Sequence, residues 1–408
     1  MSQIASHPVA APTKPTWRLV LLLGSMIATG ALSIDMYLPS LPTIARDLHG
    51  VAGSAEPSVS AFFIGLAIGQ LIYGPLSDRV GRRGPLLAGL CLYVAASLAC
   101  AAAPSLPELI AARFVQALGA CSAMVIARAV VRDRFDHTQV VHVLSQLMLV
   151  MGVAPILAPL AGGYLVAVSS WRALFVVLAL FGAGLCAIVF VALPESRSLE
   201  DRRHTQGEAV LATYLTLLRS PKIAGFALAG ACAGAALFTY IANSPELAIH
   251  TFGFTPQGFA WLFGANAAGY IASAQLNRRL VGRFGSSAIL SSAIIGAILP
   301  ALAMALAAAN HFGGVYGVFG PLFLIMASLG FTQPNAAAEA LNADPRRAGA
   351  IASFTGSANF LLGASLSTLC SLFHDGSGLA MALVIAGSLA AALMAARIGA
   401  RAKGLASA

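Results

Sequence analysis

The chain has 408 residues, of which 58% are hydrophobic and only 10% are charged, and its mean hydropathy is +0.83. A soluble protein of this length does not need so much apolar surface, so the composition excludes an ordinary soluble enzyme and predicts a chain surrounded by lipid. The net charge of +9 would suggest a nucleic-acid partner in a soluble protein. Here the basic residues fall in short connections between apolar runs, and we expect no nucleic-acid partner.

Apolar runs long enough to cross a bilayer, about twenty residues each, follow one another along the chain. Charged residues or clusters of proline and glycine bound them, and a charged segment at 194–221 divides them into two sets of six. The predicted spans lie at about 17–38, 57–77, 84–103, 107–130, 139–168, 171–193, 222–244, 256–276, 286–309, 314–337, 348–372 and 377–398.

The fold class that follows is an all-α polytopic membrane protein with twelve transmembrane helices in two halves. A tail at 1–16 precedes the first six-helix half at 17–193. The central loop at 194–221 leads to the second half at 222–398, and a tail at 399–408 ends the chain.

The basic residues predict the orientation, because cytoplasmic loops of membrane proteins hold the excess of lysine and arginine. With both termini on one side, that side receives 21 of the 24 lysines and arginines. We therefore expect cytoplasmic termini, and a first helix retained as an uncleaved signal-anchor.

The two predicted halves carry related segments about two hundred residues apart. LSDRVGRRG at 76–84 follows the second span, and LNRRLVGRFG at 276–285 follows the eighth. Duplicated halves with a substrate site between them are typical of secondary transporters, whereas a channel more naturally has oligomeric symmetry and a filter.

Two ionisable residues stand out within the spans of the first half. Asp35 lies near the end of the first span, where an ionised carboxylate away from water is costly. Arg113 lies inside the fourth span and cannot lose its charge, so it must face a polar cavity, a carboxylate or carbonyl groups, and Gln116 lies one turn later on the same face. We expect Asp35 to exchange protons and Arg113 to be its electrostatic partner. The structural alternatives are an interfacial cap for Asp35 and a helix-bridging donor for Arg113.

Other polar residues within the spans either line a cavity or bond to adjacent helices, and one sequence does not separate these roles. We assign to the substrate cavity Tyr37, Gln116, Asn243, Asn266 and Asn359.

Common catalytic and nucleotide-binding patterns are absent from the sequence. It contains no G-x-x-x-x-G-K-[ST] loop, no H-E-x-x-H and no G-x-S-x-G, and its six cysteines form no C-x-x-C pair. We expect no enzyme activity, no metal and no cofactor, and therefore a proton gradient as the source of energy.

The segment GPLSDRVGRRG at 74–84 resembles the signature loop of the major facilitator superfamily and sits between the second and third spans, as in that family. RFVQALG at 113–119 and LPES at 193–196 are further matches, so the resemblance covers the whole chain. It implies a conformational latch at the cytoplasmic side, formed by Gly74, Asp78, Arg79, Gly81, Arg82 and Arg83.

APLAGG at 158–163 resembles the motif of the drug:proton antiporter branch. DMYLPSLP at 35–42 and MGVAPILAP at 151–159 resemble the bicyclomycin/chloramphenicol resistance (Bcr/CflA) subfamily. Ala117 and Ala158 stand where the general patterns have glycine, and both replacements remain small. The antiporter-like motif of the fifth span comprises Gly152, Pro155, Pro159, Gly162 and Gly163.

The resemblance implies a multidrug efflux protein, a drug:proton antiporter of the bacterial inner membrane that exports small amphipathic compounds such as bicyclomycin or chloramphenicol-type drugs. The expected partners are that substrate, protons and membrane lipid, and we expect a monomer. The alternative is proton-coupled uptake of a nutrient by the same fold.

Overall fold

The computed structural model describes residues 16–51, 53–135, 137–197, 210–344, 347–373 and 376–405. In these ranges the chain forms α-helices joined by short connections and contains no strand. The helices of the first half are α1 (Trp17–Asp35), η1 (Leu38–Ser40), α2 (Leu41–Asp47), α3 (Pro57–Val80), α4 (Arg83–Ala102), α5 (Leu106–Arg134), α6 (His137–Val168) and α7 (Trp171–Ala192). Those that follow are α9 (Val210–Arg219), α10 (Pro221–Glu246), η2 (Leu247–Thr251), α11 (Pro256–Phe284), α12 (Ser286–Ala309), α13 (Gly314–Ala343), α14 (Ala348–Leu372) and α15 (Leu379–Leu405).

The predicted fold class is confirmed, and each predicted span corresponds to one long helix. The first span differs, because the regular helix α1 ends at Asp35 rather than at residue 38. Pro39 and Pro42 follow closely, and proline lacks the amide that a continuing helix needs, so the chain passes through the short helices η1 and α2. This break places Asp35 at a helix end.

Nine helices in the described ranges are long and apolar enough to cross a membrane. The long helices α11 and α14 fall outside this set because they carry more polar residues, and α6 falls outside it because its apolar stretch within the described residues, Val153–Val168, is short. Each of these three contacts the other half of the molecule, so its polar side chains need not all face lipid.

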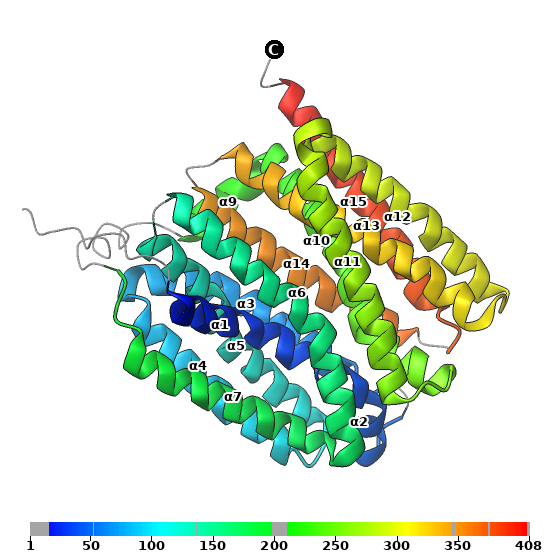
Figure 1. Ribbon diagram of the computed structural model, residues 1–408. Helices are drawn as coiled ribbons and strands as arrows, with labels where there is room; N and C mark the ends of the chain where they lie inside the picture. Colours follow the sequence, from blue (N-terminus) through cyan, green and yellow to red (C-terminus); the bar gives the residue numbers. More distant parts are fainter. Residues whose placement is uncertain are drawn as a thin grey trace, which may run out of the picture.

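The molecule consists of two groups of helices, α1 to α7 and α10 to α15, which lie beside each other in Figure 1. They meet along two seams, one between α3 and α14 and the other between α6 and α11. We call the end of the bundle that carries Trp17, Arg82 and Arg197 the basic end. The other end, which carries Glu56 and Phe312, is called the opposite end.

Glycine and proline set the ends of several helices. Proline is the first residue of α3, α10 and α11, where a missing amide costs nothing. Gly81 ends α3 with φ of +110°, a backbone conformation that side chains disfavour. The turn between α3 and α4 therefore depends on this glycine.

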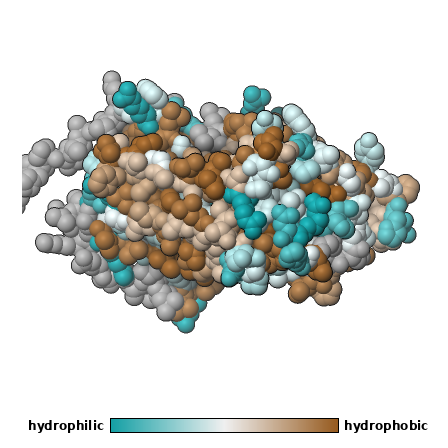
Figure 2. All heavy atoms as spheres, turned by 90° about the horizontal axis from the view of Figure 1, so that it is seen from below, coloured by the Kyte–Doolittle hydropathy of each residue, from teal (hydrophilic) through white to brown (hydrophobic). Residues whose placement is uncertain are grey.

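The outer surface is apolar where lipid is expected. Figure 2 shows mostly hydrophobic side chains over α4 and α7, with hydrophilic ones gathered toward the opposite end. Leu98, Leu180, Phe190 and Val191 are at least half exposed on these two helices. Such a surface is stable only in an apolar solvent, and the chain is therefore a polytopic membrane protein.

Helix α6 approaches α1 very closely at Gly162. A side-chain carbon at this position would overlap the carbonyl oxygen of Met36, in the break that follows α1. One residue later, the carbonyl of Gly163 accepts a hydrogen bond of 3.3 Å from Nε2 of Gln257 in α11. The glycine pair therefore brings α6 against both the end of α1 and the second half.

Gly162→Ala is expected to destabilise the protein, because its methyl group would overlap backbone atoms that cannot rotate away. Overpacking of this kind costs about 1–3 kcal/mol. Gly184→Ala is the matched control, since Gly184 in α7 has nothing within 4 Å of the added carbon. Thermal unfolding in detergent should show a lower melting temperature for Gly162→Ala alone, and equal melting temperatures for the two variants would contradict the close approach.

Candidate functional site

Arg113 lies on α5 in the middle of the first half and is fully buried. Its Nη1 atom donates to the carbonyl oxygen of Ser33 at 3.0 Å and to Oε1 of Gln116 at 2.7 Å. Gln116 in turn donates from Nε2 to the hydroxyl of Ser97 at 2.8 Å. The spacing of Arg113 and Gln116 on one helical face thus produces a direct contact, which extends to α4.

Aromatic rings supply the rest of the surroundings of this guanidinium. Its central carbon lies 4.2 Å from the ring centre of Phe62, 4.5 Å from that of Tyr37 and 5.8 Å from that of Phe175. A cation over an aromatic face gains about 2 kcal/mol or more when water is excluded. Nε and Nη2 of Arg113 have no hydrogen-bond partner among the described residues, so the rings replace part of the missing solvation.

Asp35 is the last residue of α1 and is 5% exposed. Within the described part of the chain, its carboxyl group makes no ion pair and no hydrogen bond. It acts electrostatically on the phenol of Tyr240 in α10, which belongs to the other half. The structure does not pair Asp35 with Arg113, which instead binds the carbonyl of Ser33 two residues earlier in the same helix.

The other residues expected in the cavity have different surroundings. The hydroxyls of Tyr37 and Ser58 are hydrogen-bonded at 2.7 Å, so Tyr37 and Gln116 form walls around Arg113. Asn266 donates to the hydroxyl of Tyr240 at 3.0 Å, which places it near Asp35, and Oδ1 of Asn359 is buried without a hydrogen-bond partner in the described ranges. Asn243 lies toward the opposite end, and its contacts are described below. A role in substrate binding stays a prediction for each of them.

An aromatic cluster joins the two halves at the seam between α3 and α14. The ring of Phe238 in α10 lies 4.5 Å from that of Phe63 in α3 and 5.0 Å from that of Phe360 in α14. Sequence reasoning did not single out these residues, because phenylalanine in an apolar span is ordinary. Only the packing of the two halves brings the three rings together.

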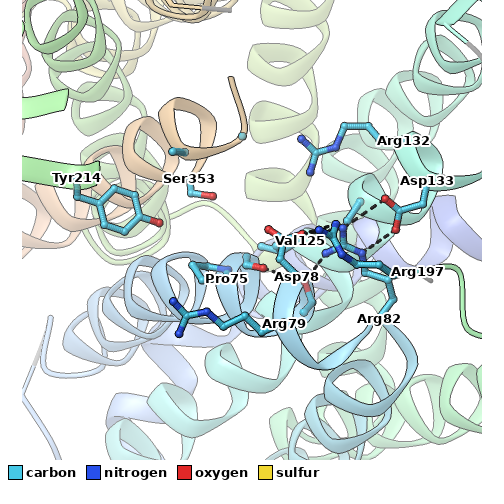
Figure 3. A pocket seen from close by; sticks show the side chains of 15 residues that line it. Pro75, Asp78, Arg79, Arg82, Val125, Arg132, Asp133, Arg197, Tyr214 and Ser353 are labelled. Carbon is cyan, nitrogen blue, oxygen red and sulfur yellow. Dashed lines mark hydrogen bonds and ion pairs between the residues drawn. The ribbon is translucent and has the colours of Figure 1, made fainter. Parts of the chain in front are cut away.

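The expected latch forms an ion-pair network at the basic end. Arg82 contacts Asp78 at 2.8 Å through Nη2 and Asp133 at 2.8 Å through Nε, and Nη1 of Arg197 donates to Asp78 at 3.1 Å. Figure 3 shows these side chains pointing toward one another, with Tyr214 and Ser353 on the far side of the pocket. Asp78 thus accepts hydrogen bonds from two arginines, Arg82 and Arg197.

Glu195 ties the segment after α7 to the turn between α3 and α4. Its Oε1 accepts from the backbone amide of Arg82 at 2.8 Å, and its Oε2 accepts from that of Arg83 at 3.2 Å. These amides lie at the start of α4, where helix dipoles favour an anion. The segment LPES therefore caps a helix of the first half.

A pocket of about 410 Å³ lies at the basic end between the two halves. The first half contributes Asp78, Arg132 and Asp133, while Tyr214 of α9 and Ser353 of α14 come from beyond the central connection. The network of Asp78 and Arg82 therefore faces residues of the second half, where separation or approach of the halves changes its surroundings.

The remaining latch residues play different parts. Gly74 and Arg79 line the pocket, whereas Gly81 forms the turn described above. Arg83 donates to the carbonyl of Phe190 at 2.5 Å and covers its ring, so it lies beside α7 and outside the pocket lining. Asp133 is the member that sequence reasoning missed, although an acid between Arg132 and Arg134 is a local signal for an ion pair.

The antiporter-like motif lies entirely in α6. Pro155 and Pro159 are inside this helix, and Gly162 and Gly163 make the close approaches already described. The side-chain packing around Gly152 lies outside the described residues. Proline removes one intrahelical hydrogen bond and favours a bend, and Pro159 lies about one turn before Gly162, which meets the end of α1.

Comparison with known proteins agrees with this architecture. The sequence profile of the Major Facilitator Superfamily matches residues 21–368. The chain is 30% identical to the Bicyclomycin resistance protein homolog of Haemophilus influenzae over 360 residues, 87% of this chain and 89% of that one. It is also 30% identical to the Chloramphenicol resistance protein of Pseudomonas aeruginosa over 312 residues, 75% and 72% of the two chains. The structure of a D-xylose-proton symporter superposes with a TM-score of 0.73, at 13% identity, over 94% and 97% of the two chains.

Two six-helix halves with buried ionisable groups between them define a secondary transporter of the membrane. The chain belongs to the major facilitator superfamily. Its resemblance to resistance proteins of this family, expected from the motifs at 35–42 and 151–163, is confirmed.

Asp78→Asn is expected to slow transport severalfold without reducing the amount of protein in the membrane. The amide keeps the size of the side chain but loses the charge that holds Arg82 and Arg197. Asp344→Asn is the control at the same end, because Asp344 pairs with the neighbouring Arg347 within one connection. Initial rates in inverted vesicles, normalised to protein amount, measure the effect. A normal rate for Asp78→Asn would contradict the latch and would mean that the arginines serve only to set the topology.

Proposed function

We propose that this protein is a proton-coupled efflux transporter that exports small amphipathic compounds in exchange for protons. The observation that carries the proposal is the Asp35 carboxyl group, which is buried at the end of α1 without an ionic partner among the described residues and acts electrostatically on Tyr240 of the other half. The names of the similar resistance proteins support drugs of the bicyclomycin or chloramphenicol type as substrates.

The coupling follows from competition at one place in the molecule. A neutral Asp35 can remain buried between the halves, whereas an ionised one requires water or a cationic or hydrogen-bonding substrate. Proton and substrate therefore stabilise the site alternately as it faces the two sides of the membrane. Such differential binding is what shifts a two-state equilibrium and drives exchange.

Arg113 acts in this proposal through the backbone of α1 rather than as a direct partner of Asp35. It holds the carbonyl of Ser33, one of the last carbonyls of α1, and is itself fixed by Gln116 and three rings. This arrangement positions the end of α1 and, with it, the carboxyl group of Asp35.

The basic end faces the cytoplasm in this proposal, and the membrane is the inner membrane of a bacterium. This side holds 21 of the 24 lysines and arginines, which supports the orientation because cytoplasmic loops hold the excess of basic residues. The protein then works as a monomer embedded in lipid, with a proton gradient as its energy source and no cofactor. An uptake transporter would have the same fold, and the direction of coupling decides between the two.

Asp35→Asn should abolish proton-driven uphill transport and retain substrate exchange, because the amide resembles the neutral acid but cannot release a proton. Proteoliposomes with an imposed pH gradient and a radiolabelled drug measure both activities. Glu108→Gln is the control, since Glu108 is an exposed acid at the start of α5. Uphill transport by Asp35→Asn at the normal proton-to-drug ratio would remove Asp35 from the coupling mechanism.

Labelling of introduced cysteines tests the orientation. Phe312→Cys, 76% exposed at the opposite end, should react with a membrane-impermeant maleimide added to intact cells, whereas Arg202→Cys in the central connection should react only after the cells are broken. The parent protein measures the background from the native cysteines. External labelling of Arg202→Cys would reverse the proposed topology.

A further inference from the structure

A second buried carboxyl group lies at the opposite end, where the two halves touch. Glu56 immediately precedes α3 and is 1% exposed. Its Oε2 atom is hydrogen-bonded to the hydroxyl of Ser371 near the end of α14, in the other half. Four residues later in α3 and four residues earlier in α14, the hydroxyls of Ser60 and Ser367 are 2.9 Å apart. These contacts close the seam between α3 and α14 at this end.

The hydroxyl of Ser371 has three acceptor oxygens around it but only one hydrogen to give. Besides Glu56, Oδ1 of Asn243 and the carbonyl oxygen of Ser367 both lie 3.1 Å from it. Nδ2 of Asn243 donates to the carbonyl of Thr239 at 2.9 Å, which fixes Oδ1 toward Ser371. If the carboxyl group itself supplies the hydrogen of its contact, the single hydrogen of Ser371 is left for Asn243 or for the carbonyl of Ser367.

The charges around Glu56 also favour its neutral form. Oε1 of Glu56 is buried without a hydrogen-bond partner among the described residues. The charged group that acts on it comes from α10 and is another acid, Glu246, which is 2% exposed. His250 lies behind Glu246, with Nδ1 3.8 Å from Oε1. An ionised Glu56 would therefore be an uncompensated charge in an apolar interface, which is strongly unfavourable.

Burial is the main cause that raises the pKa of Glu56 from its ordinary value of 4.5 to about 8. Where the hydroxyl of Ser371 is the donor, its hydrogen bond opposes this shift, and the negative charge of Glu246 adds to the shift. Separation of the halves would expose the same carboxyl group to water and return its pKa toward the ordinary value.

We propose that Glu56 is a second proton-binding group, and that its protonation is the condition for the halves to close at the opposite end. The inference rests on alternating access in the proposed function but assigns a separate role to this residue. Glu56 is a gate for closure, whereas Asp35 carries the coupled proton.

The position of Glu56 determines where its proton comes from and where it goes. The carboxyl group lies outside the membrane spans, so it exchanges protons with the solution at the opposite end. It takes up a proton as that end closes and returns it to the same solution as that end opens. The group therefore makes closure depend on pH and leaves the number of transported protons unchanged.

The sign of the pH dependence follows from the two pKa values. The closed state binds the proton more tightly, so protonation favours closure fully below about 4.5, and this advantage is lost as pH rises to about 8. Between these limits the ratio of open to closed molecules should rise about ten-fold per pH unit.

Spin labels on Val51→Cys and Phe312→Cys, in a cysteine-free background and in lipid nanodiscs, report the separation of the halves at this end. Both positions are more than three-quarters exposed, one in each half. Pulsed electron paramagnetic resonance from pH 5 to pH 9 should show the long distance becoming more populated as pH rises. When Glu56→Gln is introduced into the spin-labelled protein, the short distance should persist at every pH, because glutamine cannot ionise.

Glu108→Gln, which removes an exposed acid at the same end, should leave the pH response unchanged. In Glu246→Gln the opening with rising pH should be complete at a lower pH, because removing the like charge lowers the pKa of Glu56. His374 and Asp375 follow α14 in the sequence, outside the described residues, and their replacement by asparagine should have no effect.

Several results would overturn the proposal. A native pH response in Glu56→Gln, or loss of the response in the variant of His374 and Asp375, would assign the titration to another group. If exchanging choline for sodium at constant pH changed the distances, the bound ion would be a metal cation and not a proton. The distances are measured without substrate, so they test Glu56 even if drug export is wrong. A changed proton-to-drug ratio in Glu56→Gln liposomes would make it a transport residue instead of a gate.

Discussion

A guanidinium that cannot lose its proton lies in the middle of the first half, and the surrounding structure is arranged to hold it. Arg113 has no carboxylate partner in the described ranges, so carbonyl, amide and aromatic groups take the place of water. This requirement fixes the end of α1 relative to α5. It thereby also fixes Asp35, whose position depends on a residue that it does not contact.

The two halves are joined by contacts that can be broken without a large penalty. Single hydroxyl and amide hydrogen bonds and an aromatic cluster connect α3 with α14, and no ion pair between the halves is seen in the described part of the seams. Within the first half, by contrast, Arg82 binds two acids. Such a distribution gives rigid halves with a seam that opens, which alternating access requires.

The sequence predicts features that depend on local pattern. Span length, the breaks at proline and glycine, and the contact between Arg113 and Gln116 all follow from spacing along one helix. The rings around Arg113 come from α3, from α7 and from the break after α1, and no pattern in α5 predicts them. The sequence does not indicate that Glu56 is buried, because a charge just before a span is normally solvated. Only the packing of α14 against it buries this side chain.

The contact between Gly162 and the carbonyl of Met36 leaves no room for a side chain between α6 and the residue that follows Asp35. A compound that binds against the proline-containing part of α6 and shifts it would therefore displace Asp35 without contacting it. Inhibitors that act at a distance from the proton site are a consequence of this geometry, and so are resistance mutations in α6 that alter coupling while sparing drug contacts.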